Sequence, residues 1–155
     1  MLVEKVKFFK EEYIPLLHNL TADQPAKWGK MDAQQMVEHM RDVCKLANGK
    51  ITLPLLNTDP EQLLQARHFM MSNHPFQENI RVSVMPEDPK PHKYADLKEA
   101  IAKTETELMD VFTWYDNNPL GKLMHPMFGK LDYEQQIHYL YKHAYHHARQ
   151  FGLVD

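Results

Sequence analysis

Residues 132–152 of the chain read DYEQQIHYLYKHAYHHARQFG, and this stretch decides the fold. Its apolar side chains recur in steps of three and four, which is the pattern of an amphipathic helix. They are Tyr133, Ile137, Leu140, Ala144 and Phe151, and His147 lies on the same stripe. Asp132 can cap the N-terminus of this helix, and Gly152 can stop it. We therefore predict a helix from Tyr133 to Phe151 that carries histidine on its buried face.

Two more helices are predicted in the first third of the chain. Between residues 2 and 20 the apolar residues again follow a helical stripe, but Pro15 should kink or split that helix near Tyr13. The second helix should run from Ala33 to Ala47. Asp32 and Gln35 have the spacing of a capping box at its start, and Asn48-Gly49 follows its end.

The middle of the chain is less regular. Asp59-Pro60 has the form of a helix start and predicts a short helix to about Met71. Ile80, Val82 and Val84 alternate briefly, as in one extended segment, before the prolines at 86, 89 and 91 end regular structure. A long amphipathic helix should follow at 94–116, ended by Asn117-Asn118-Pro119.

Four long amphipathic helices without a convincing sheet predict an all-α fold. The arrangement expected is a four-helix bundle in which a long irregular crossover joins helices two and three. A chain of 155 residues fits one domain, spanning residues 1–155.

Composition argues against several classes of partner. The formal net charge is −3 and the chain has no basic run, so we expect neither nucleic acid nor an anionic membrane as a partner. No stretch approaches the roughly 20 apolar residues of a membrane span, and charges interrupt the N-terminus too often for a signal sequence. Cys44, the single cysteine, excludes an internal disulfide and suits a reducing compartment. These features predict a soluble, cytoplasmic protein.

Three histidines have the spacing of a metal site. His143 and His147 lie four residues apart, which places their side chains one above the other on the predicted last helix. His39 lies at the edge of the apolar stripe of the second helix. Three imidazoles from facing helices would hold one divalent ion and leave coordination positions open, which is typical of a reactive metal rather than a structural one.

The alternative is that these histidines are ordinary core residues. A single histidine at the edge of a core is usually just hydrogen-bonded, whereas two buried imidazoles on one face are costly unless something satisfies both. His146 lies off the stripe and is expected at the surface. The zincin motif is absent, because the segment reads His143-Ala144-Tyr145-His146-His147, and no glutamate precedes a histidine by three residues as in di-iron bundles.

Several neighbours of the triad have two readings each. Asp42 could orient an imidazole or be a surface ion-pair residue, and Gln150 could be a hydrogen-bond donor beside the site or a polar cap at the helix end. Tyr139 could line the pocket or belong to the core. We interpret three other features as structural: Cys44 as a core residue, Trp28-Gly29 as a plug before the second helix, and 125–129 as a turn that packs Phe128.

Segments at both ends of the chain resemble the DinB/YfiT-like superfamily of metal-binding four-helix bundles, in particular an uncharacterised branch of it. The matching segments are Trp28-Gly29-Lys30-Met31, Gln35 to Met40, His125 to Leu131 and Lys142 to Gly152. The resemblance implies nickel, zinc or a similar ion held by His39, His143 and His147. Characterised relatives use low-molecular-weight thiols, as bacillithiol transferases and mycothiol-dependent maleylpyruvate isomerase do, but residues 50–93 match those enzymes poorly.

Two functions follow as hypotheses. The first is a metal-dependent enzyme of the thiol-transferase or isomerase type, acting on a small-molecule substrate with a low-molecular-weight thiol as co-substrate. The second is a metal-binding or stress-response module without turnover. Neither hypothesis determines the oligomeric state, and a homodimer is compatible with both.

Overall fold

The computed structural model describes residues 2–78 and 88–155, and the chain is mostly helical. The elements are, in order, α1 (Leu2–Lys7), the π-helical segment η1 (Phe8–Glu12), α2 (Tyr13–Leu17), α3 (Ala33–Ala47), α4 (Pro60–Met71), α5 (Leu97–Asn117), β1 (Leu123–His125), β2 (Gly129–Leu131) and α6 (Tyr133–Gln150). The alternation at Ile80, Val82 and Val84 lies outside the described residues.

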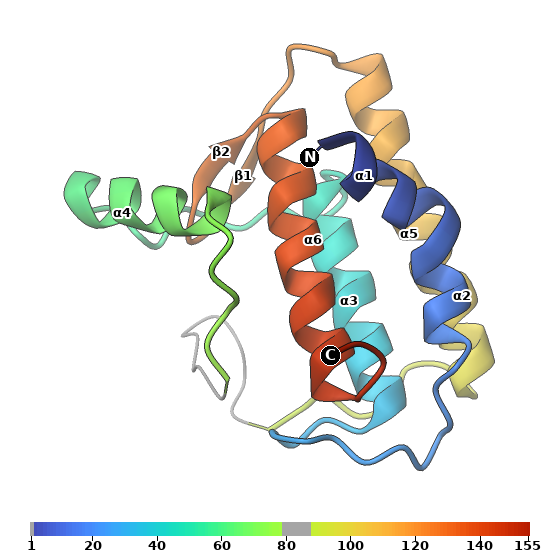
Figure 1. The fold of residues 1–155 in the computed structure, drawn as a ribbon. Coiled ribbons are helices and arrows are strands. Elements are labelled where there is room, and N and C mark those ends of the chain that lie inside the picture. Colours follow the sequence, from blue (N-terminus) through green and yellow to red (C-terminus); the bar gives the residue numbers. More distant parts are fainter. Residues whose placement is uncertain (1, 79–87) are drawn as a thin grey trace.

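The long helices surround one apolar core. α3 packs against α5 and α6, α1 packs against α6, and α2 packs against α5 (Figure 1). The largest fully buried side chains come from every helix except α1, and also from β2 and the residue after α6: Phe9, Tyr13, Leu17, Met36, Met40, Met70, Ile101, Leu108, Leu131, Ile137, Leu140 and Phe151. Thr104 on α5 donates a hydrogen bond to the carbonyl of Val37 at 3.1 Å, which fixes α5 against α3. These contacts leave α3 and α6 side by side.

Local sequence signals explain where α3 and α6 begin. The Asp32 side chain accepts from the Gln35 backbone N–H at 2.7 Å, and the Gln35 side chain accepts from the Asp32 N–H at 2.9 Å. Asp132 and Gln135 form the same reciprocal pair before α6. Such capping boxes satisfy backbone N–H groups that have no partner inside the helix. The predicted bounds of α3 are confirmed, and α6 ends one residue early, at Gln150.

The first helix is interrupted as Pro15 suggested, although the disturbance lies one turn before the proline. The N–H of Tyr13 bonds to the carbonyl of Phe8, five residues back, so the turn from Phe8 to Glu12 is wider than an α-helical turn. Because the turn is wide, Phe8 and Phe9 are both buried although they are adjacent.

Two expectations need correction. The long helix begins at Leu97, not Tyr94, because Asp96 caps it and because Glu38 accepts the N–H of Tyr94 at 3.2 Å. The chain also contains a sheet that was not expected, an antiparallel hairpin in which Leu123 pairs with Leu131 and His125 with Gly129. The Tyr115 hydroxyl donates to the Leu131 carbonyl at 2.8 Å and ties the hairpin to α5.

α4 lies within the crossover between α3 and α5 and projects away from the long helices in Figure 1, beside α6 and the hairpin. The Arg67 guanidinium donates to the carbonyls of Phe128 and Lys130, which holds α4 against the hairpin. The helix from Asp59-Pro60 to Met71 is confirmed.

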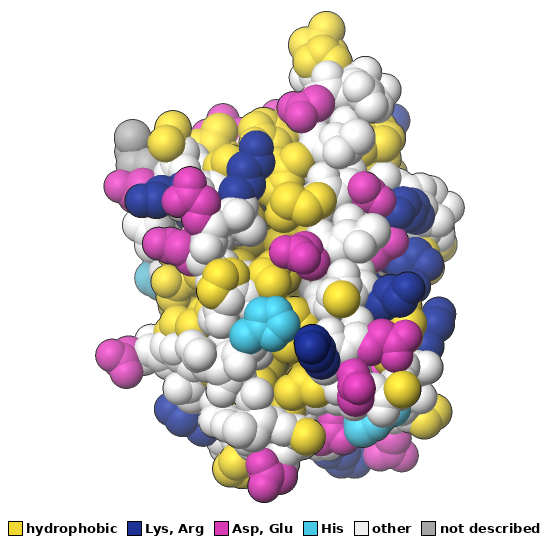
Figure 2. All heavy atoms as spheres, turned by 90° about the vertical axis from the view of Figure 1, so that its right-hand side faces the viewer, with side chains coloured by type: hydrophobic (Ala, Val, Ile, Leu, Met, Phe, Trp, Pro, Cys, Tyr) yellow, Lys and Arg dark blue, Asp and Glu magenta, His cyan; other side chains and the backbone are white. Residues whose placement is uncertain are grey.

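Figure 2 shows the face that lies on the right in Figure 1, where α2 and α5 are found. Acidic and basic side chains are interspersed there among hydrophobic ones, so this face has no region of a single charge. In the described part of the chain, no helix combines the length and apolar character needed to cross a membrane.

Candidate metal centre

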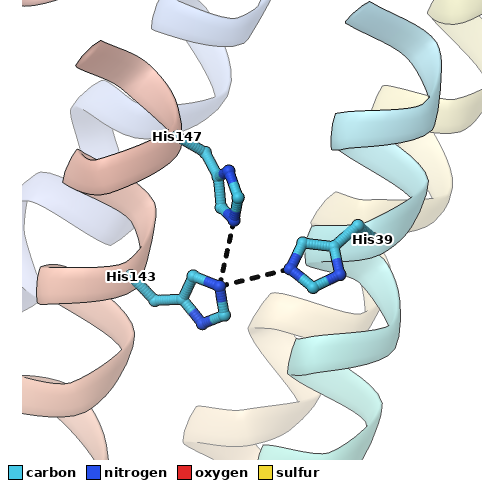
Figure 3. Close-up of side chains that lie close together, drawn as sticks. All are labelled: His39, His143 and His147. Atoms are coloured by element: carbon cyan, nitrogen blue, oxygen red, sulfur yellow. Dashed lines mark hydrogen bonds between the residues drawn. The ribbon is translucent and has the colours of Figure 1, made fainter. Parts of the chain in front are cut away.

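The three predicted histidines converge between α3 and α6. Figure 3 shows His39 pointing from α3 toward His143 and His147, which project from successive turns of α6. The Nε2 atoms of His39 and His143 are 3.2 Å apart, and those of His143 and His147 are 3.0 Å apart. All three ligand nitrogens lie within 4.8 Å of one another. The structure therefore brings the three predicted residues together.

The spacing fits a single metal ion. Two nitrogens bound to one zinc ion at about 2.0–2.1 Å are roughly 2.9–3.4 Å apart when the angle between the bonds is between 90° and tetrahedral. The two measured separations, 3.2 and 3.0 Å, fall in this range. The set consists of three neutral nitrogen donors, which suits zinc, nickel or another transition metal better than calcium or magnesium.

Gln150 fixes the tautomer of His147. The Gln150 Nε2 donates to the Trp28 carbonyl at 2.9 Å, so its Oε1 faces the Nδ1 of His147 at 2.7 Å. An amide oxygen only accepts, and Nδ1 must therefore carry the proton. The lone pair of His147 is then on Nε2, the atom that faces the other two rings. Gln150 acts as an acceptor toward the site, whereas the sequence suggested a donor.

Tyr139 holds His143 in a similar way. Its hydroxyl lies 2.8 Å from the Nδ1 of His143, and burial raises the pKa of this hydroxyl, so it stays protonated. In the metal-free protein the Tyr139 O–H can donate to Nδ1 while Nε2–H of His143 donates to Nε2 of His147. An ion held by His143 Nε2 would require the ring proton on Nδ1, where the Tyr139 oxygen could accept it. The Tyr139 hydroxyl can therefore form a hydrogen bond with His143 Nδ1 in either tautomer of that ring.

The surroundings keep the imidazoles neutral. Burial lowers the pKa of His39 to about 4, and the nearby Asp42 carboxylate only partly offsets this effect. Burial also lowers the pKa of His143 and of His147 well below the ordinary value, and the neighbouring histidines add to the shift. Neutral imidazoles are the form that binds metal, so at pH 7 no proton has to be removed from a charged ring.

Asp42 is a surface residue rather than an orienting group. Its carboxylate lies 3.1 Å from Arg41 and 3.5 Å from Lys90. Among the described residues it has no hydrogen bond to His39. The structure supports the interpretation of Asp42 as a surface ion-pair residue.

The prediction that His146 is a surface residue is wrong, because only 8% of its surface is exposed. Its ring centroid lies 5.4 Å from Trp28, 6.0 Å from Phe76 and 5.0 Å from His147. His146 lies outside the apolar stripe of α6, but the segment around Phe76 and the loop around Trp28 cover this face of the helix. Its Nδ1 has no hydrogen-bond partner among the described residues.

Two aromatic residues near the site were not predicted from the sequence. The Phe76 ring lies 5.7 Å from His143 and 6.4 Å from Tyr139, in edge-on contacts. The His125 ring lies 4.5 Å from Tyr139 and also contacts Phe128, so the hairpin turn supports the tyrosine that holds His143. Neither residue lies on a regular stripe, and no sequence signal connected them with the triad.

Cys44 has the structural role that we expected. It is fully enclosed, and burial raises the pKa of its thiol to about 12. A thiol in that state is neither a nucleophile nor a metal ligand at neutral pH.

No protein-family model, curated protein or solved structure matches the chain. What points to a metal centre is the position of the three histidines and of the groups that hold their rings.

Proposed function

We propose that this protein is a four-helix bundle of the DinB/YfiT-like type that binds one divalent ion, nickel or zinc, through His39, His143 and His147. The observation that supports the proposal most directly is that His143 Nε2 lies 3.2 Å from His39 Nε2 and 3.0 Å from His147 Nε2, with one ligand atom of each ring within 4.8 Å of the others. The Nδ1 atoms of His143 and His147 each have a partner of their own, as metal-binding imidazoles almost always do.

The proposed chemistry is that of a metal-dependent thiol transferase or isomerase. An ion bound at the three histidines would lower the pKa of a small thiol and present it to an electrophilic substrate as a thiolate. The three imidazoles leave coordination positions free, and the partly exposed His39 and His143 are on the side from which a ligand would approach. Phe76 and Tyr139 would form apolar walls there, and both remain uncharged at neutral pH.

The first experiment measures metal content. Protein purified without a histidine tag should contain or take up about one nickel or zinc ion per chain, as a mononuclear site requires. Alanine substitution at His39, His143 or His147 should each reduce uptake strongly. His138→Ala is the matched control, because His138 is on α6 but outside the triad. If His146→Ala abolishes binding while His39→Ala does not, the assignment of the three ligands is wrong.

The second experiment separates an enzyme from a binding module. Metal-loaded protein is mixed with a small thiol and a chromogenic aryl halide, and loss of the thiol is followed over time. Turnover that disappears in His143→Ala supports the transferase reading. Full metal binding without turnover for any thiol tested supports the alternative, a metal-binding or stress-response module.

A further inference from the structure

A cavity lies on a face of α6 that does not carry the histidine triad. It has a volume of about 150 Å³ and is bounded by α1, by α6 and by the segment that follows α4. The residues of α6 that line it include His138, Lys142, Tyr145 and Arg149. At 3.6 residues per turn, this stripe is rotated by roughly 150° about the helix axis from His143 and His147. The cavity is therefore separate from the candidate metal centre.

The lining of this cavity is strongly basic. Lys5, Lys142 and Arg149 line it together with His74 and His138, and no acidic residue does. Glu134 approaches His138 at 4.0 Å, and acidic side chains of α1 and η1 lie near Tyr141, but none of them forms part of the wall. In the described ranges, no carboxylate lies within ion-pair distance of Lys5, Lys142 or Arg149. The face in Figure 2, by contrast, mixes charges of both signs.

Lys142 supplies a buried positive charge whose hydrogen-bond partners are all neutral, and burial together with the nearby Lys5 ammonium lowers its pKa to about 8. Its Nζ donates to the carbonyls of Phe69 at 2.6 Å and His74 at 2.5 Å, and to the Ser72 hydroxyl at 3.3 Å. Only 8% of the residue is exposed. The three donors of the ammonium are used, so Lys142 anchors the segment after α4 and contributes charge to the cavity without contacting a ligand directly. A buried charge of this kind gains from a nearby anion.

Lys5 and Arg149 have donors to spare. Lys5 Nζ lies 5.3 Å from the centroid of the Tyr141 ring, and Arg149 makes no side-chain hydrogen bond to another described residue. Both side chains are partly buried at the cavity, Lys5 from α1 and Arg149 from α6. An arginine offers five N–H donors in a planar fork, and a lysine offers a point charge, which together are a common set for oxyanions.

We propose that this cavity binds a small oxyanion of charge −2, a phosphate group or a short dicarboxylate, with Lys5 and Arg149 as donors and Lys142 as the buried countercharge. The volume of about 150 Å³ agrees with such a ligand, because a cavity of about that size can hold a molecule as large as benzene. Tyr141 and Tyr145 add aromatic side chains to the wall, which suits a small organic anion as well as inorganic phosphate.

The test uses the full-length, metal-free protein in a buffer of fixed ionic strength, with inorganic phosphate and succinate as separate probes. Binding is followed by the thermal unfolding midpoint and by amide chemical shifts of residues around 138–149. We expect saturable changes with at least one probe, and no change with chloride at equal ionic strength. Phosphate alone would identify a phosphate site, and succinate alone a carboxylate site. No saturable response to either probe up to about 20 mM, a very weak affinity, would overturn the proposal.

Charge-removing variants then test the assigned donors. Lys5→Gln and Arg149→Gln should each weaken binding about tenfold, the size expected when a charged hydrogen bond is lost. Lys7→Gln is the matched control, because Lys7 is also on α1 and loses the same charge but is exposed and does not line the cavity. It should change affinity less than about twofold, the limit for a distant surface charge. Equal losses in all three variants would mean general attraction by surface charge, and would also overturn the proposal.

Discussion

Replacing Gln150 by leucine should weaken metal binding by about 10- to 100-fold, which corresponds to roughly 1.4–2.8 kcal/mol. Gln150 is only 3% exposed, so water cannot readily replace the bond that its Oε1 accepts from His147 Nδ1 at 2.7 Å. Leucine leaves that N–H without an acceptor, and an unsatisfied buried donor costs about 1–3 kcal/mol. His147 avoids the cost by moving its proton to Nε2, the nitrogen that should bind the ion.

The matched control is Gln136→Leu on the same helix. Gln136 is also 3% exposed and donates to the Tyr115 hydroxyl at 3.2 Å, close to the hairpin rather than to the histidines. In the metal-free state each neutral hydrogen bond lost should cost about 0.5–1.5 kcal/mol of unfolding free energy, and more if the partner stays unsatisfied. Gln136→Leu removes the bond to Tyr115, whereas Gln150→Leu removes the bonds to His147 and to the Trp28 carbonyl and should lose more stability. Only Gln150→Leu should lose metal affinity.

The assay is competition for nickel or zinc against a chromogenic chelator, with urea unfolding of the metal-free proteins measured in parallel. The parallel measurement is needed because a destabilised protein binds any ligand less well. The reasoning fails if Gln150→Leu binds metal within about threefold of the unaltered protein, since one lost hydrogen bond of this kind should exceed that. It also fails if Gln136→Leu weakens binding equally.

Gly29→Ala should lower metal affinity several-fold in the same competition assay, because the added Cβ would lie 2.8 Å from Gln150 Nε2. The control is Gly152→Ala, which has a similar positive φ but only an ordinary contact of 3.5 Å. It should lower the stability of the protein without lowering its metal affinity. Tyr139→Phe should weaken binding up to about tenfold while circular dichroism stays helical, because His143 Nδ1 loses its partner; unchanged affinity would contradict that role. The unfolding free energy of the metal-free protein, measured in urea, should fall as the pH falls from about 6.5 toward 4. In this range the three histidines take up protons in the unfolded chain but remain neutral in the folded protein, so protonation favours unfolding. The triad pKa values are lowered, that of His39 to about 4, and each histidine contributes at most about 1.4 kcal/mol per pH unit; a flat profile would mean that the rings are not buried as neutral groups.

The helices with complete local signals could be predicted from the sequence nearly residue by residue. α3 has a reciprocal cap at one end and Asn48-Gly49 at the other, so its limits depend on contacts within a few residues. The same is true of the start of α6. The start of α5 was three residues off because Tyr94 is held by Glu38, on a helix far away in the sequence. A contact between distant segments leaves no periodic pattern.

The triad itself could be predicted because each of its members lies on, or at the edge of, a helical stripe. What covers it could not be predicted. His146 is buried by Trp28 and Phe76, which belong to irregular segments before and after α3, far from α6 in the sequence. The hairpin was missed for a related reason, since its strands have only three residues each and an alternating pattern needs more.

The wide turn at Phe8–Glu12 sets the angular position of everything that precedes it. Each residue added to a helix rotates the preceding part by roughly 100° and advances it by about 1.5 Å. Deleting one residue from this turn would let the helix run uniformly from α1 into α2, and the side chain of Lys5 would swing away from Tyr141 to another side of the helix. His39, His143 and His147 lie on other helices and would keep their geometry. A one-residue change in length near the N-terminus could therefore alter the basic cavity while leaving the histidine cluster intact.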